Sequence, residues 1–327
     1  MTTDRTTYVV GPPPPGHPPA VPLPYHRLAR VTHRHRWWRP LLGTLVVVGG
    51  TMLSMLVLLV LVELAGMATD RPADAEGWRS WGDIGDAAIL LLSIAVAIPP
   101  VLLAARWTQR RPAGTVSSVA GHLRWRWLGT CLVAGLPLVA AALGISVLLP
   151  GPTGDSEDVV WAGLSSFLLG LAMVCALVPF QAAAEEYVCR GWLVQAVGAW
   201  CRSPWIAVVP QSVLFAAAHG WGTPWGFADL VVFGLVTGVL TVRTGGLEAA
   251  IALHVLNNLL AMGIAAAIAG ALASDETAAD MEPLGFAVDV VMLVLYAAVV
   301  LWLARRRRLD ALSAPGTGPE PDPTAVP

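Results

Sequence analysis

Long apolar segments alternate with short polar segments along most of the chain. Eight of them approach the roughly 20 residues that a membrane-spanning helix needs. They cover about 41–66, 84–105, 127–149, 160–183, 204–219, 225–242, 247–271 and 284–304. None shows the alternating, turn-punctuated pattern of barrel strands. The pattern predicts an all-α fold, a polytopic membrane bundle of about eight transmembrane helices.

The composition agrees with a membrane protein. Of the 327 residues, 56% are hydrophobic and only 13% are charged, which excludes an ordinary soluble domain. The first apolar segment is about 26 residues long, whereas the core of a signal peptide has about 7–15, so an uncleaved membrane anchor is expected. The sequence contains no glycine pattern of a nucleotide-binding loop. No nucleic-acid partner is expected either.

The apolar segments form one predicted transmembrane domain, residues 41–304, between two tails. Residues 1–40 are rich in proline and then basic, and residues 305–327 are basic and then rich in proline and alanine. Both tails are expected to be disordered and cytoplasmic. The four cysteines show neither CxxC nor paired extracellular spacing, so no disulfide is expected.

The basic residues are all arginine, and their positions predict the topology. Arginines gather at 27–39, 106–126 and 305–308, whereas acids gather at 70–86, 155–158 and 275–282. With eight spans, these groups fall alternately on opposite sides of the membrane. The excess of positive charge in cytoplasmic loops then places both termini in the cytoplasm of a multi-pass protein of the cell membrane.

Some motifs within the bundle have a structural interpretation. Pro99-Pro100 and Pro179 should kink or break their helices. Gly234 and Gly238 have the GxxxG spacing that allows close helix packing. Asp229 and Asp289 fall near predicted helix starts, as acids at the membrane interface do.

The first candidate for chemistry is the acid pair Glu185-Glu186 with Arg190 one turn later. Successive residues of a helix point about 100° apart, so the two carboxylates cannot face the same way. Glu186 and Arg190 have the i,i+4 spacing of an ion pair that would fix the helix. Glu185 would remain free for chemistry. The alternative is a cytoplasmic helix end with interfacial charges.

Two histidines lie in apolar segments farther along the chain. His219 follows Phe215 by one turn, and the glycine-rich run 220–226 must end its helix there. His254 and Asn258 share a helix face, and Asn257 points about 100° away. Such groups suit an oxyanion hole or a supported metal ligand. Taken singly, each could instead be a packing residue or make a hydrogen bond between helices.

Together, a glutamate, two histidines and an asparagine on three helices can activate a water molecule and stabilise an oxyanion. Cys189 is an alternative nucleophile, but no motif supports it. The predicted spans place Glu185 near the cytoplasmic face and His219 about 22 Å from that face at 1.5 Å per residue. The two can meet only if a boundary shifts or the helix near 204 begins deep in the membrane.

In this order, the three motifs resemble the CPBP family of intramembrane proteases, which contains Rce1-type CAAX prenyl endopeptidases and bacteriocin-processing or self-immunity proteins. The resemblance covers about residues 160–270. It implies an endopeptidase acting on a membrane-associated or lipidated peptide or protein within the bilayer.

The resemblance also implies a role for each residue of the motifs. Glu185 would be the general base, acting with His219 on water. His254 and Asn258 would hold the oxyanion, while Glu186 and Arg190, with Phe215 in the second motif, would support the site. The family is often described as metalloproteases, and zinc could be bound by Glu185, His219 and His254. No HExxH motif is present, and the metal-free mechanism is favoured.

Two other functions agree with the same sequence. One is a non-catalytic membrane scaffold or immunity protein with this fold, although such a protein would be expected to lose some of the motifs. The other is a transporter in which buried acids and histidines relay protons, but no inverted repeat supports it.

The topology prediction can be tested with reporter fusions after residues 75, 115, 155 and 312. Because the arginine and acid segments alternate, the fusions should report outside, inside, outside and inside, in that order. A periplasmic signal from the fusion at 312 would contradict the prediction.

Overall fold

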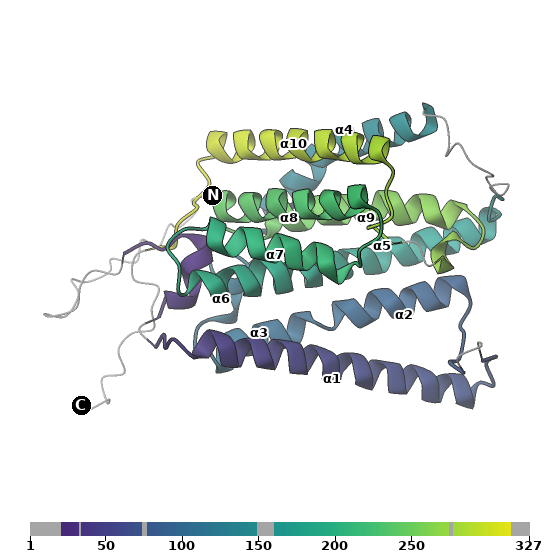
Figure 1. The fold of residues 1–327 in the computed structure, drawn as a ribbon, viewed down its shortest axis with the longest axis horizontal. Helices are drawn as coiled ribbons and strands as arrows, with labels where there is room; N and C mark the ends of the chain where they lie inside the picture. Colours follow the sequence, from purple (N-terminus) through teal and green to yellow (C-terminus); the bar gives the residue numbers. More distant parts are fainter. Residues whose placement is uncertain (1–20, 33, 74–76, 149–159, 275–276, 315–327) are drawn as a thin grey trace, which may run out of the picture.

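The computed structural model describes residues 21–32, 34–73, 77–148, 160–274 and 277–314. Most of the two tails lies outside these ranges, as do the acids at 155–158 and 275–276. The described part is a bundle of helices that lie side by side along the long axis of the molecule (Figure 1). No β-strand longer than an isolated bridge occurs in the described residues, and the predicted helical membrane bundle is confirmed.

Seven described helical segments are long and apolar enough to cross a membrane. They are α1 (Arg39–Ala68), α2 with α3 (Asp83–Ala95 and Ile98–Trp107), α4 (Trp125–Leu148), α5 (Leu164–Glu186) with its continuation to Gly198, α8 (Pro224–Thr244), α9 (Glu248–Ala267) and α10 (Pro283–Arg306). The remaining apolar segment, predicted at 204–219, forms α7 (Trp205–Ala218). Its 14 residues extend about 21 Å, less than the roughly 30 Å of a hydrocarbon core.

The helices pack around α5 and α9, which contact each other extensively. On one side, α2 packs on α5, and α1 packs on α3. On the other, α8 packs on α9 and α7, and α10 packs on both α8 and α4. In Figure 1, α1 and α2 form one edge of the bundle, and α10 with α4 forms the opposite edge. The interior helices therefore place their polar side chains away from lipid.

The helix that carries the acid pair is longer than predicted. The apolar segment at 160–183 was expected to end near Glu185, but helical structure continues through a π-helix (Tyr187–Leu193) and α6 (Val194–Gly198). Gly198 lies 13 residues beyond Glu185, or about 20 Å along a helix. The expected helix end near Glu185 was therefore wrong, because the polar residues that suggested it are buried inside the bundle.

Proline and glycine act partly as predicted. The helix that begins at Asp83 is interrupted after Ala95, and Pro99 and Pro100 occupy the first turn of α3. In contrast, α5 continues through Pro179. A Cβ atom added at Gly234 would lie 2.8 Å from the Ser212 backbone, and one at Gly238 would lie 2.7 Å from Val208. The GxxxG pair thus provides the close packing of α8 on α7.

Part of the N-terminal segment is ordered, contrary to the prediction of a disordered tail over residues 1–40. Residues Tyr25–Arg30 form a 3₁₀ helix, η1, and the buried Tyr25 donates a hydrogen bond to the carbonyl of Val116. Leu23 and Ser313 exchange hydrogen bonds of 2.9 and 3.0 Å. The two described ends of the chain therefore lie together at one end of the bundle.

A buried ion pair at this end was not predicted from the sequence. Glu248, at the start of α9, accepts hydrogen bonds from the Nε and Nη2 atoms of Arg124 at 2.9 and 2.7 Å. Its side chain is fully buried, and that of Arg124 is nearly so. The pair attaches the segment before α4 to the first turn of α9, where a negative charge is also favoured by the helix dipole.

Candidate active site

The carboxylate of Glu186 joins the first and third sequence motifs. Its Oε1 atom accepts a hydrogen bond from Arg190 at 3.0 Å and another from Nδ1 of His254 at 2.8 Å. The side chains of Glu186 and Arg190 are fully buried, and that of His254 is 4% exposed. The predicted i,i+4 contact is therefore present. A buried charge needs such partners, so Glu186 is engaged in structure and is closed to solvent.

Glu185 lies in a different environment. Its side chain is 17% exposed, and its Oε1 atom accepts a 2.6 Å hydrogen bond from the amide of Gln181. Its Oε2 atom lies 3.6 Å from Nε2 of His254 and has no hydrogen-bond partner among the described residues. The structure thus separates the two acids as their helical spacing predicts. Each carboxylate keeps one buried oxygen without a described hydrogen-bond partner, but only the side chain of Glu185 is partly exposed, and its unpartnered oxygen faces His254.

His254 stands between the two carboxylates. Its Nδ1 atom donates to Glu186, which leaves Nε2 on the side of Glu185. A hydrogen bond from one ring nitrogen to a carboxylate fixes the orientation of an imidazole and places a proton on that nitrogen. A proton can therefore be held or passed between Nε2 of His254 and the free oxygen of Glu185.

Gln181 was missed by the sequence analysis. Its side-chain Nε2 donates to Glu185, and its Oε1 accepts a 2.9 Å hydrogen bond from Nδ2 of Asn258. This chain of two amides links the Asn258 end of the third motif to Glu185. An amide nitrogen carries two N–H groups, so Asn258 retains one for another acceptor. The available signal was a glutamine in an apolar segment four residues before Glu185.

Two stacked aromatic rings lie beside the polar groups. Phe215 and Phe233 have ring centroids 5.7 Å apart. The guanidinium of Arg190 lies 4.3 Å from the Phe215 centroid, and the edge-on ring of His254 lies 5.0 Å from that of Phe233. These contacts give Arg190 a cation–π partner and exclude water around the Glu186 ion pair. Phe233 was not predicted, because one phenylalanine among many apolar residues carries no separate signal.

His219 is less closely joined to the carboxylates. It ends α7, its Nδ1 donates to the carbonyl of Phe215 at 2.9 Å, and its ring packs on that of Phe215 at 4.7 Å. Among the described contacts, no hydrogen bond or ion pair joins His219 to Glu185. Because Nδ1 is engaged, Nε2 is the ring atom available to a ligand or a water molecule.

Other polar residues of the bundle lie outside this cluster. Asn257 and Asp289 line a cavity of about 50 Å³ between α4, α9 and α10. Asp229 had been expected at the membrane interface, but it is buried next to Asp289. Cys189 is a free, half-buried thiol packed against apolar residues. No described side-chain hydrogen bond or ion pair joins these residues to Glu185 or His254.

The proposed zinc ligands are not arranged as a metal site. Over the described ranges, no three His, Cys, Asp or Glu side chains are grouped in a way that could hold a metal ion. Both nitrogens of His254 face carboxylates, and no described hydrogen bond or ion pair joins His219 to Glu185 or His254. Among the described residues, Glu185, His219 and His254 are thus not gathered into one set of zinc ligands.

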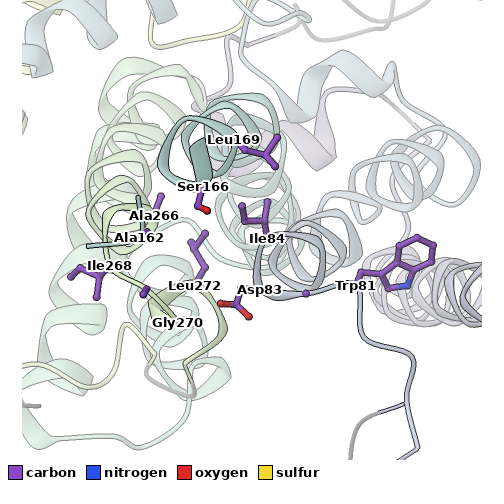
Figure 2. Close-up of a pocket in the computed structure, with 12 residues that line it drawn as sticks. Trp81, Asp83, Ile84, Ala162, Ser166, Leu169, Ala266, Ile268, Gly270 and Leu272 are labelled. Carbon is purple, nitrogen blue, oxygen red and sulfur yellow. The ribbon is translucent and has the colours of Figure 1, made fainter. Parts of the chain in front are cut away.

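A larger cavity, of about 400 Å³, lies far from these residues. Figure 2 shows Asp83, Ser166 and Leu272 around it, contributed by the start of α2, by α5 and by the segment after α9. Asp83 is its only ionisable lining residue. Ser166 precedes Glu185 by 19 residues, or roughly 28 Å along the helix. This cavity therefore lacks the groups needed for acid–base chemistry.

The different environments of the two glutamates predict different effects of mutation on stability. Glu186→Gln weakens the interactions with both Arg190 and His254 and should lower the unfolding free energy by up to about 3–5 kcal/mol. Glu185→Gln is the matched control, because its amide can keep one hydrogen bond with Gln181. When thermal unfolding is measured in detergent, the stability of Glu185→Gln should be close to that of the wild type. Equal destabilisation by the two variants would contradict the assignment.

Comparison with known proteins agrees with the motifs. Residues 164–260 match the sequence model of the type II CAAX prenyl endopeptidase Rce1-like family, a range that contains Glu185, Glu186, Arg190, His219, His254 and Asn258. An uncharacterized protein of Bacillus subtilis, YyaK, is 28% identical over 222 residues, which cover 65% of this chain and 73% of YyaK. No solved structure gives a significant match. The resemblance predicted from the sequence is thus confirmed: residues 164–260 of this helical membrane protein are similar to the Rce1-like family.

Proposed function

We propose that the protein is an intramembrane endopeptidase that hydrolyses a peptide bond of a membrane-associated or lipidated protein or peptide. The observation that carries this proposal is the environment of Glu185. Its carboxylate is partly exposed, it is held at one oxygen by Gln181, and its other oxygen faces Nε2 of His254. A positioned carboxylate with a free oxygen and a neighbouring imidazole is a suitable general base for a water molecule.

The reaction begins with removal of a proton from water by Glu185. The resulting hydroxide oxygen bonds to the carbonyl carbon of the substrate, and the carbonyl oxygen becomes an oxyanion. The remaining N–H of Asn258 and a protonated His254 would stabilise that oxyanion. When the C–N bond breaks, the proton held by Glu185 passes to the leaving amine. The products are a new carboxyl end and a new amino end.

His219 would contribute from the end of α7, where its ring packs on that of Phe215. Donation from Nδ1 to the Phe215 carbonyl leaves the Nε2 lone pair to accept a hydrogen bond from the attacking water. This role requires a water molecule within reach of both His219 and Glu185. His219 is therefore proposed to orient the water, whereas Glu185 takes its proton.

The proposed orientation puts the end of the bundle that carries both chain ends in the cytoplasm. The support is the arginine content of this end, which includes the N-terminal segment and the last turn of α10. Glu185 would then lie within the membrane, about 20 Å along the helix from the inner end at Gly198. A substrate would reach it while associated with the membrane.

The proposal predicts that Glu185→Gln, His219→Ala and His254→Ala each abolish cleavage without preventing membrane insertion. Loss of one oxyanion donor alone costs a factor on the order of 10²–10³. Membrane and secreted peptides would be compared by mass spectrometry between cells that express wild-type protein and each variant. Peptides with new termini should be present only with the wild type.

Cys189→Ala is the matched control for that experiment, because Cys189 adjoins the motif on the same helix but forms no described hydrogen bond with Glu185 or His254. Its products should equal those of the wild type. If Glu185→Gln cells also produce every wild-type peptide, the endopeptidase proposal is wrong. A membrane scaffold or immunity protein of the same fold would then be the better account.

Metal dependence provides a separate prediction. Because the described side chains do not form a zinc site, we expect the purified protein to contain less than one equivalent of zinc and to retain activity after treatment with a chelator. Elemental analysis and a peptide-cleavage assay would measure both. Stoichiometric zinc, together with activity that is lost to chelator and restored by zinc, would contradict the metal-free mechanism.

A further inference from the structure

Arginine side chains gather at the end of the bundle where the two ends of the chain meet. They come from the N-terminal segment, the first residue of α1, the turn after α3 and the loop between α6 and α7. The group, called the arginine cluster below, consists of Arg27, Arg30, Arg34, Arg36, Arg39, Arg110 and Arg202. It is separate from the Glu185 site and is not used by the proposed hydrolysis.

The positive charge of this cluster is not compensated by acids of the described chain. Partial burial, followed by the charges of Arg30 and Arg202, lowers the pKa of Arg27. Burial, followed by Arg30 and Arg39, lowers the pKa of His35. Arg39 is repelled by Arg110, Arg36 and Arg34. Among the described residues, no carboxylate contributes to the electrostatic environment of these three groups, so an anion from outside the chain would relieve the repulsion.

Hydrogen-bond donors in the cluster also lack partners. The Nε and Nη1 atoms of Arg39 and the Nε atom of Arg27 are buried without a hydrogen-bond acceptor in the described part of the chain. Unpaired buried donors are costly. A phosphate group can accept from several guanidinium N–H groups at once, and arginine matches its geometry. The donors therefore favour a phosphate over a simple neutral ligand.

Exposed tryptophans place the cluster at the surface of the membrane. Trp37 is 68% exposed and Trp107 is 66% exposed, and Trp38, Trp200 and Trp205 are also exposed. They flank the arginines in sequence, at the ends of the apolar helices α1, α3 and α7. Tryptophan in such positions marks the level of lipid headgroups. The nearby source of phosphate is thus the membrane itself.

We propose that the arginine cluster is a binding site for anionic phospholipid headgroups, with Arg39 and Arg110 as its principal phosphate ligands. The charge of the cluster, its unpaired donors and its position beside exposed tryptophans together support a lipid over a soluble anion. Basic sites at the ends of transmembrane helices bind anionic lipid in this way. The proposal does not depend on the endopeptidase activity.

The test is a titration of the purified full-length protein in neutral detergent. Phosphatidylglycerol is added, and thermal unfolding is followed; phosphatidylcholine and inorganic phosphate are the comparison ligands. Phosphatidylglycerol should raise the Tm of the wild type, whereas the other two should not. The double variant Arg39→Gln, Arg110→Gln should bind phosphatidylglycerol at least roughly 10-fold more weakly, because it loses two charge-assisted hydrogen-bond donors to the phosphate.

A matched control removes the same charge from the same end of the bundle. Arg243 and Arg305 are exposed residues in the last turns of α8 and α10, outside the cluster. The variant Arg243→Gln, Arg305→Gln should keep the affinity of the wild type. If the Arg39 variant does not fold, Arg110→Gln alone, at an exposed position, should retain less phosphatidylglycerol in native mass spectrometry than the control.

Three outcomes would overturn the proposal. The cluster variant and the control could show equal affinity for phosphatidylglycerol, which would indicate only a general effect of charge. Phosphatidylcholine could raise the Tm equally, which would show that the headgroup charge is not recognised. Inorganic phosphate alone could reproduce the effect, which would identify a site for a soluble anion instead of a lipid.

Discussion

The arrangement of the candidate site depends on one buried carboxylate, that of Glu186. In an apolar interior, a carboxylate is stable only if charged or hydrogen-bonding groups surround it. Arg190 meets this need from the same helix and His254 from α9. Arg190 also packs against Phe215 of α7 and Phe233 of α8. The requirement to pair one charge thus brings together four segments of the bundle and fixes the position of His254.

The shape of the helix explains how two adjacent glutamates have different surroundings. Glu186 ends the α-helical part of α5, and the π-helix Tyr187–Leu193 follows directly. Short π-helical segments occur often at functional sites, because they change which residues share a face. Here Arg190 lies in the π-helix and pairs with Glu186, four residues before it. Glu185 lies beside Gln181, which in turn binds Asn258. The two neighbouring carboxylates therefore have different surroundings, one fully buried and one partly exposed.

Local spacing predicted the parts of this structure that involve one helix. The Glu186–Arg190 contact and the break before Pro99 follow from rules that apply within a few residues. The end of α5 was predicted wrongly, because charged residues were taken as a sign of water, whereas here they pair with each other and with His254. Contacts between helices distant in sequence, such as Asn258 with Gln181 and Arg124 with Glu248, have no local signal.

The most direct test of this account is a pair of double-mutant cycles on the unfolding free energy in detergent. The first cycle combines Glu186→Gln with His254→Asn, and the second combines Glu185→Gln with His254→Asn. The account predicts a coupling energy of about 1–3 kcal/mol for Glu186 with His254 and less than about 0.5 kcal/mol for Glu185 with His254. The reverse order would show that Glu185 is the structural carboxylate, and it would contradict the division of roles on which the proposed mechanism rests.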